Sequence, residues 1–218
     1  MEKKRKRRLS GRLVAYFLGL FIMTLGIAIS VKSDLGVSPV SSLPYAFTLC
    51  WGVEMGLATF VMHCVLVLFQ ILLLRKKFRL KLLLQIPVGV VFGYFTTFCN
   101  GLMDYLPSTE NIIVRFILLI VSVILVAIGI SFYLPADIMP LAGEGFVQAF
   151  SDATRTPFPR AKIVSDVGMV ALAIIICRLK LFSFGSVGIG TIVSALLTGI
   201  ILAQLEKIYA KILRRNSS

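Results

Sequence analysis

Residues 13–31 read Leu13-Val-Ala-Tyr-Phe-Leu-Gly-Leu-Phe-Ile-Met-Thr-Leu-Gly-Ile-Ala-Ile-Ser-Val31 and contain no charged side chain. A helix of about 20 apolar residues is long enough to cross the hydrocarbon core of a bilayer, so this stretch predicts a transmembrane helix. A basic cluster precedes it, as in a secretory signal peptide. However, the apolar run is long and no small-x-small cleavage motif follows it, so we expect it to be retained in the protein.

The rest of the sequence is equally apolar. Of the 218 residues, 58% are hydrophobic and only 15% are charged, whereas a soluble domain carries about 25% charged residues. Five further apolar stretches follow the first: Gly56–Leu74, Leu83–Met103, Ile112–Leu134, Ile163–Cys177 and Val187–Leu205. We therefore predict an all-α integral membrane protein with about six transmembrane helices, in a single membrane domain that covers residues 1–218.

The net charge of +13 is unevenly distributed along the chain. If the N-terminus lies in the cytoplasm and six spans alternate, 19 of the 23 Lys and Arg residues fall on the cytoplasmic side. They form four groups, Lys3–Arg12, Arg75–Lys81, Arg155–Lys162 and Lys207–Arg215. Such a bias marks the cytoplasmic side, so we predict a multi-pass protein of the bacterial plasma membrane with basic tails and both termini inside. The groups lack the interleaved aromatic residues of nucleic-acid-binding surfaces, so the expected partner is the lipid bilayer and not nucleic acid.

A weak internal repeat relates the two halves of the chain. A shift of 103 residues places Gly26 on Gly129 and Asp34 on Asp137. The predicted repeats cover about residues 12–106 and 110–213. Each contains three spans, and because three is an odd number the second repeat must be inverted relative to the first. Inverted repeats are common in secondary transporters.

A polar, broken stretch follows the first span of each repeat, at residues 33–48 and 135–151. Ser38-Pro39 is typical of an N-cap followed by proline at the first helical position, and Pro140 is the corresponding proline of the second stretch. Each stretch predicts a half-helix too short to span a bilayer. The half-helices either re-enter the membrane, with their positive dipole ends toward the midplane, or lie flat at the interface.

Polar residues in these stretches and in the third span are candidates for lining a solute site. Ser41 and Tyr45 share one helical face, and Glu144 and Gln148 share another. The candidates for binding a substrate are Asp34, Ser38, Ser41, Tyr45, Glu144, Gln148, Gln85 and Asn100. The alternative is that such residues hydrogen-bond neighbouring helices and have a structural role.

His63 and Asp166 are ionisable residues inside predicted spans, and the 103-residue shift superposes them. Ionisable groups at membrane depth usually face a cavity or a partner. We therefore consider them candidates for a proton-coupling pair. The alternative is that His63 binds a backbone carbonyl and that Asp166 caps its helix near the membrane surface.

Enzymatic and metal-binding motifs are missing from the sequence. The four cysteines, at positions 50, 64, 99 and 177, do not have metal-ligand spacing, and no metalloprotease, hydrolase or nucleotide-binding motif is present. We therefore expect no catalytic residues, no metal and no cofactor.

Three segments resemble one known family. Asp34-Leu-Gly-Val-Ser-Pro-Val-Ser-Ser42, Gln85-Ile-Pro-Val-Gly-Val-Val-Phe-Gly-Tyr-Phe95 and Gly188-Ile-Gly-Thr191 are similar to segments of the YczE/YitT-like bacterial membrane proteins, and the likeness extends over residues 13–205. Leu141–Gly145 departs from the Gly-Pro turn that this family often has in its second half. The resemblance identifies Arg160, Lys162 and Asp166 as counterparts of the basic and acidic residues that follow this turn. It implies a six-helix membrane protein and a transporter, without naming a substrate.

These observations favour a small-solute secondary transporter or permease, with proton coupling as a hypothesis. The alternative is a non-transporting accessory or regulatory membrane protein that acts on a membrane partner. The solute is not identified by the sequence, and a homodimer is compatible with a chain of this size.

Overall fold

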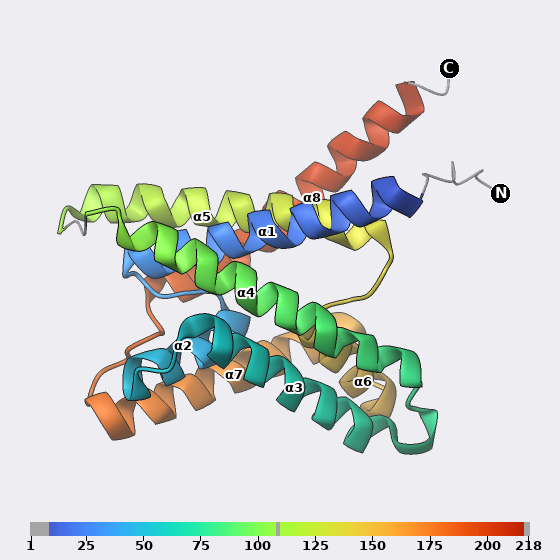
Figure 1. Cartoon of the computed structure of the whole chain (residues 1–218), viewed down its shortest axis with the longest axis horizontal. Helices are drawn as coiled ribbons and strands as arrows, with labels where there is room; N and C mark the ends of the chain where they lie inside the picture. The colour runs from blue at the N-terminus through green and yellow to red at the C-terminus, as the bar shows by residue number, and fades with distance from the viewer. Residues whose placement is uncertain (1–8, 108–109, 216–218) are drawn as a thin grey trace.

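The computed structural model describes residues 9–107 and 110–215, and every regular element within them is helical (Figure 1). The α-helices are α1 (Leu9–Ser33), α2 (Pro39–Trp51), α3 (Met55–Leu74), α4 (Gln85–Asp104), α5 (Ile112–Tyr133), α6 (Ala142–Thr154), α7 (Phe158–Leu181) and α8 (Ile189–Arg215). Short 3₁₀ turns cover Arg75–Lys77, Leu80–Leu84 and Leu134–Ala136.

Four helices of the described chain are long and apolar enough to cross a membrane. They are Leu9–Ser33, Met55–Lys77, Leu80–Asp104 and Ile112–Ala136, the last three including an adjoining 3₁₀ turn. The other two predicted spans fall in α7, which is 24 residues long but carries five charged residues, and in α8, whose described apolar part is Ile189–Leu202. The prediction of an all-helical membrane protein is thus confirmed, and composition supports four of its six spans.

The long helices α1 and α5 lie side by side along the longest axis of the molecule and form its most extensive helix–helix contact (Figure 1). Glycines allow their backbones to touch. A Cβ atom added to Gly129 would lie 2.7 Å from the carbonyl oxygen of Gly19, and one added to Gly26 would lie 2.8 Å from that of Ser122. Small residues are the usual means of close helix packing in membranes. α4 packs beside α1, and α8 packs beside α5.

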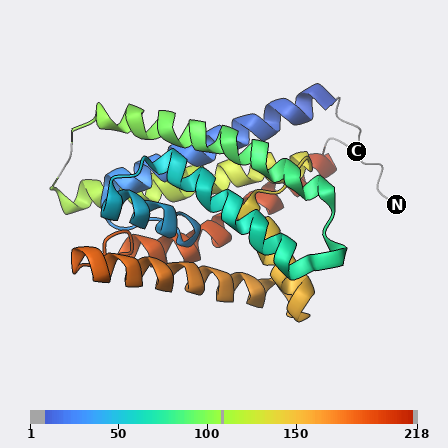
Figure 2. The ribbon, with the colours of Figure 1, turned by 60° about the horizontal axis from the view of Figure 1, so that its bottom comes forward.

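The short helices α2 and α6 belong to a second layer with α3 and α7 (Figure 2). α2 packs on α7 and also contacts α3, whereas α6 packs on α3 and also contacts α7. In Figure 1, α2 lies to the left of the middle of the molecule and α6 lies to the right. Each short helix therefore covers only one end of the second layer.

Sharp turns precede and follow both short helices. Asp34 and Asp137 have φ values of +53° and +50°, a left-handed conformation that Asp tolerates better than most residues. They direct the chain back from the ends of α1 and of the Leu134–Ala136 turn. At their C-termini, α2 and α6 are followed by the C-cap residues Gly52 and Arg155, whose backbones are also left-handed. These conformations produce two similar excursions of the chain between long helices.

The α1–α5 contact predicts that Gly129 cannot be substituted without a loss of stability. We expect Gly129→Ala to lower the free energy of unfolding by about 1–3 kcal/mol, because the added methyl group overlaps backbone atoms that cannot move aside. The matched control is Gly199→Ala in α8, where a Cβ atom has no neighbour within 4 Å. Thermal unfolding of both purified variants in detergent measures the difference. Equal melting temperatures for the two variants would contradict the close contact.

Candidate functional site

The first turns of α2 and α6 meet in the interior of the protein. A Cβ atom on Gly143, the second residue of α6, would lie 3.5 Å from Cγ1 of Val40, the second residue of α2. Val40 also packs against the buried cluster that contains Ala142, Leu66 and Met169. The N-terminal ends of both short helices, with their unpaired N–H groups and positive dipole ends, therefore lie next to each other.

The starts of these helices match the sequence prediction only in part. Ser38 occupies the N-cap position of α2 and Pro39 the first helical position, as expected. The Ser38 hydroxyl, however, makes no capping bond and instead donates to Ser41 Oγ at 3.0 Å. In the second half, Leu141 is the N-cap residue, so Pro140 lies one residue outside the cap and not at the first helical position.

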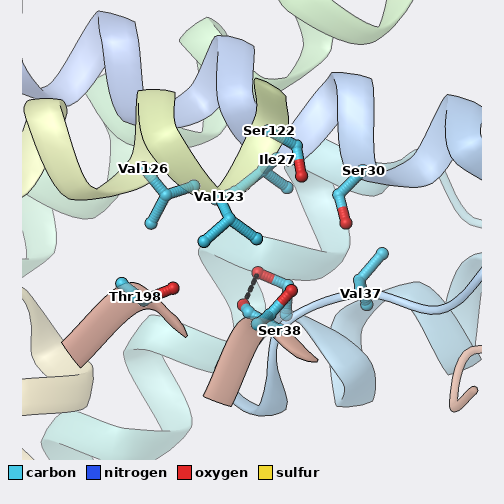
Figure 3. Close-up of a pocket in the computed structure, with 10 residues that line it drawn as sticks. Ile27, Ser30, Val37, Ser38, Ser122, Val123, Val126 and Thr198 are labelled. Atoms are coloured by element: carbon cyan, nitrogen blue, oxygen red, sulfur yellow. Dashed lines mark hydrogen bonds between the residues drawn. The ribbon is translucent and has the colours of Figure 1, made fainter. Parts of the chain in front are cut away.

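A small cavity lies beside the first turn of α2 (Figure 3). It has a volume of about 10 Å³, roughly the space that one water molecule requires. It is lined by Ile27, Ser30, Val37, Ser38, Ser41, Ser122, Val123, Val126, Ser194 and Thr198. We call it the serine cavity, because six of these ten residues carry hydroxyl groups and none is charged.

Most hydroxyl groups of the serine cavity are hydrogen-bonded within the protein. Ser30 donates to the Gly36 carbonyl at 3.3 Å, and Ser122 donates to the Leu119 carbonyl at 2.7 Å. Ser194 and Thr198 are the exceptions, because neither side chain makes a hydrogen bond with the described residues, and Ser194 is the more buried of the two at 5% exposed. The cavity therefore offers a buried, uncharged hydroxyl that is available to a bound molecule.

A second polar site lies beside the first turn of α6. Glu144 is the third residue of this helix, and its Oε2 atom is shielded from solvent without a hydrogen-bond partner among the described residues. The Tyr133 hydroxyl is also buried and lies beside this carboxyl group. Tyr16 packs edge-to-face on Tyr133, with ring centroids 6.1 Å apart, and its hydroxyl donates to the Met139 carbonyl at 2.8 Å.

Two buried glutamines join α6 to α3 and α4. Gln70 Nε2 donates to Gln85 Oε1 at 2.8 Å, and Gln85 Nε2 returns a bond to Gln70 Oε1 at 3.2 Å. Gln70 Nε2 also lies 3.3 Å from the Ala142 carbonyl, at the start of α6. Gln85 thus forms a hydrogen bond between helices. This structural role is the alternative to lining a solute site.

Two arginines hold the chain segments that lead into the short helices. Arg115 of α5 forms an ion pair with Asp34 at 3.2 Å. Arg12 of α1 donates to the Ala136 carbonyl at 2.9 Å and to the Asp137 carbonyl at 2.7 Å. Each segment is therefore fixed by an arginine of a long helix that belongs to the other half of the chain.

Comparison with known proteins places the chain in a family. A family model described as "Family of unknown function (DUF6198)" matches residues 10–207. The chain belongs to this family. It is 25% identical over 200 residues to the "Uncharacterized membrane protein YczE" of Bacillus subtilis (strain 168), which covers 90% of this chain and 86% of that protein. It is 22% identical over 195 residues to the "Uncharacterized protein YyaS" of the same organism, covering 86% of this chain and 88% of that protein.

No solved structure matches the chain. The family match and the YczE relative confirm the expected YczE-like resemblance and the assignment as a membrane protein.

The structure brings some of the candidate substrate-binding residues together and separates others. Ser38 and Ser41 line the serine cavity. Asp34 and Asn100 line a different cavity of about 240 Å³, at the ends of α1 and α4, where Asn100 donates to the Thr96 carbonyl. Tyr45 is half-buried and packs against the apolar cluster around Tyr16 and Tyr133.

Gln148 and Asp166 lie apart from the buried sites. Gln148 is exposed and donates to Asp152 at 2.9 Å, so it does not join Glu144 in the interior. Asp166 accepts two bonds of 2.8 Å from Lys162, one turn earlier in α7.

His63 is buried among aromatic and small residues. Its ring stacks on Phe92 with centroids 5.4 Å apart, and its Nδ1 atom has no hydrogen-bond partner among the described residues. Among the described residues, no hydrogen bond or ion pair joins His63 to Asp166, whose carboxylate pairs with Lys162, so their role as a proton-coupling pair stays a prediction.

The sequence reasoning missed several residues of the two sites. They are Tyr16, Tyr133, Gln70, Ser30, Ser122 and Ser194. Each is a single polar residue inside an apolar helix, which is common in membrane helices and carries no distinguishing pattern. Gln70 gave the clearest available signal, because an amide in the middle of an apolar span needs a partner.

The glutamine pair predicts a non-additive effect on stability. Gln70→Met leaves the buried Gln85 amide without its partner, so we expect a loss of about 1–3 kcal/mol in the free energy of unfolding. The double variant Gln70→Met/Gln85→Met removes both amides and should recover most of that loss. Thermal unfolding of the two single variants and the double variant provides the test. Additive losses would show that the two amides do not depend on each other.

Proposed function

We propose that this protein is a small-solute secondary transporter of the bacterial plasma membrane, built from two inverted repeats of three spans. The observation that carries this proposal is the meeting of the N-terminal turns of α2 and α6 at Val40 and Gly143. Two half-helices that enter from opposite membrane faces and end at a shared central point are a recurrent way of building a transport site. In this interpretation α2 and α6 are the predicted re-entrant half-helices.

Helix boundaries support the inverted repeat. The first residues of α2 and α6, Pro39 and Ala142, are 103 positions apart. The first residues of α3 and α7, Met55 and Phe158, have the same offset. This agreement, which covers two pairs of helix starts, adds to the sparse residue identities of the sequence.

Contacts between helices also support it. Exchange of the two halves converts the α2–α7 contact into the α6–α3 contact, and the α1–α4 contact into the α5–α8 contact. It also converts the Gly26–Ser122 approach into the Gly129–Gly19 approach. Contacts that interchange in this way are expected around a two-fold pseudo-symmetry axis. In this proposal the axis passes between α1 and α5 and near Val40 and Gly143.

The charge distribution supports the proposed orientation. The basic segment of residues 75–81 and the α6–α7 turn lie toward the end of the molecule where α1 begins and α8 ends (Figure 1). Residues 105–107 and 110–111 and the 182–188 connection lie toward the opposite end. Assigning the basic end to the cytoplasm follows the positive-inside rule. The six spans of the proposal are α1, α3, α4, α5, α7 and α8.

The arginine contacts are the candidates for opening and closing this site. Asp34–Arg115 lies at the proposed outer end, and the bonds of Arg12 to the Ala136 and Asp137 carbonyls lie at the proposed inner end. Arg12 and Arg115 are again 103 positions apart. Release of one contact would free the segment before one half-helix while the other contact stayed closed, as alternating access requires.

The size of the serine cavity provides an argument for the alternative function. At about 10 Å³, the cavity accepts no more than a water-sized molecule in this conformation. An accessory protein that only binds a membrane partner would need no larger opening. A transporter, in contrast, must expose this cavity to each side in turn.

Accessibility of Ser194 distinguishes the two functions. Ser194→Cys, in a background with the four natural cysteines replaced by alanine, places a thiol in the serine cavity without removing a hydrogen bond. For a transporter in sealed vesicles, we expect a membrane-impermeant maleimide to label this thiol from either face. Asp34→Asn should increase labelling from outside, and Arg12→Gln should increase labelling from inside, each severalfold.

The control for this experiment is Leu196→Cys, which places a thiol on the exposed side of the same helix. Its labelling should not respond to either arginine-contact variant. Labelling of Ser194→Cys from one face only, unchanged by both variants, would contradict transport and favour the accessory function.

A further inference from the structure

The serine cavity contains two hydroxyl groups that the protein does not use. Ser194 and Thr198 lie one turn apart on α8, and neither hydroxyl bonds another group of the described residues. A serine or threonine within a helix commonly donates to the carbonyl group of the preceding turn, as Ser122 does to Leu119 at 2.7 Å. Ser194 is also only 5% exposed, and buried polar groups are nearly always satisfied by protein, water or ligand. These two hydroxyls therefore require a partner inside the cavity.

The first turn of α2 adds a third unused donor. The Ser41 oxygen accepts the Ser38 hydroxyl at 3.0 Å, which leaves the hydrogen atom of the Ser41 hydroxyl without an acceptor among the described residues. The N-cap residue Ser38 makes no capping bond, and the first turn of α2 holds no acidic residue. The positive dipole end of this helix attracts negative charge. The groups left over around the cavity are thus donors, and they favour an acceptor that carries negative charge.

The proposed repeat explains why a cavity lies at this place. An offset of 103 residues pairs four of the lining residues with larger ones: Ser30 with Tyr133, Ser38 with Leu141, Ser41 with Glu144 and Thr198 with Phe95. Tyr133, Leu141 and Phe95 pack in one apolar cluster. Their small counterparts leave the serine cavity unfilled, so its volume follows from a difference between the two halves of the sequence.

The pairing of Ser41 with Glu144 indicates what should occupy the cavity. Glu144 places carboxyl oxygen atoms at the first turn of α6, where unpaired N–H groups favour an acceptor. At the equivalent position α2 has a hydroxyl donor instead, and none of the residues that line the cavity is charged. A bound anion would give the N-terminus of α2 the acceptor that α6 obtains from its own side chain.

We propose that the serine cavity binds a single monovalent anion of halide size, which accepts hydrogen bonds from Ser41, Ser194 and Thr198. This inference rests on the proposed transport function and names the chemical class of the transported solute. The cavity volume of about 10 Å³ provides room for about one water molecule, so a halide ion fits and a carboxylate or phosphate group does not. Because the cavity lining contains no fixed cation, it holds the ion weakly enough for release, as transport requires.

Chloride-dependent thermal stabilisation tests the assignment. The purified full-length protein is heated in sodium chloride and in sodium gluconate of equal ionic strength, because gluconate is too large for the cavity. A molecule that binds only the folded protein raises the melting temperature, so we expect a saturable increase as chloride replaces gluconate. Equal melting temperatures in the two salts would overturn the proposal and leave water as the occupant of the cavity.

Variants locate the chloride site. Ser194→Ala combined with Thr198→Val removes two donors that the protein itself does not use, so this variant should fold and lose the chloride-dependent increase. The matched control is Ser131→Ala, which should keep the increase, because the Ser131 hydroxyl donates to the Ile128 carbonyl at 2.7 Å and does not line the cavity. A full chloride effect in the double variant contradicts the site. If the double variant does not fold, Ser41→Ala decides the question, because it should weaken chloride binding by about tenfold and unchanged affinity contradicts the site.

The outcome separates this inference from the transport proposal. Labelling of Ser194→Cys from both faces, together with no chloride effect on stability, would overturn only the class of solute. Chloride stabilisation together with labelling from one face only would overturn transport and leave an anion-binding site in a protein with the accessory function.

Discussion

A bilayer offers no hydrogen-bond partner to a peptide group, and this constraint bears most heavily on the first turns of α2 and α6. Their free N–H groups can stay within the membrane only where protein or a wet cavity receives them. In the proposed re-entrant arrangement, the contact between the two turns and their packing on α3 and α7, with α8 beside α2 and α4 beside α6, meet this condition. Both polar sites lie beside these turns, since this is where irregular backbone and buried polar side chains can share partners. The arrangement of the other helices follows from the need to enclose this junction.

The glycine contact between α1 and α5 provides the frame for that enclosure. With backbones in contact at Gly19, Gly26 and Gly129, the two longest apolar helices form a rigid pair from which α4 and α8 extend. The same pair carries the arginines that hold the segments before α2 and α6. A frame of this kind allows the short helices α2 and α6 to differ in the chemistry of their surroundings. Beside α2 the lining consists of uncharged hydroxyls, whereas beside α6 it contains a carboxyl group and two tyrosines.

The sequence predicted the elements of this fold better than the site. The apolar spans and the start of α2 at Ser38-Pro39 could be predicted from the sequence, because membrane thickness and helix capping act on local segments. The proximity of Tyr133 and Tyr16 to Glu144 could not be predicted, because it results from packing between helices that are distant in the sequence. Gln148 lies one turn after Glu144, but Glu144 is already at the edge of the buried face of α6, so a further turn carries the next side chain outward. His63 and Asp166 occupy equivalent positions in the proposed repeat, but equivalent residues would meet only near its symmetry axis, where the proposal places Val40 and Gly143.

The most direct test of this account is a cysteine cross-link between the first turns of the half-helices. In a background without natural cysteines, Val40→Cys and Gly143→Cys should form an intramolecular disulfide in native membranes when a mild oxidant is added. Val40→Cys with Gln148→Cys should not, because Gln148 lies on the exposed face of α6. If the Val40–Gly143 pair stays reduced, and both thiols react readily with reagents at the membrane surface, then α2 and α6 lie flat at the interface and the central junction does not exist.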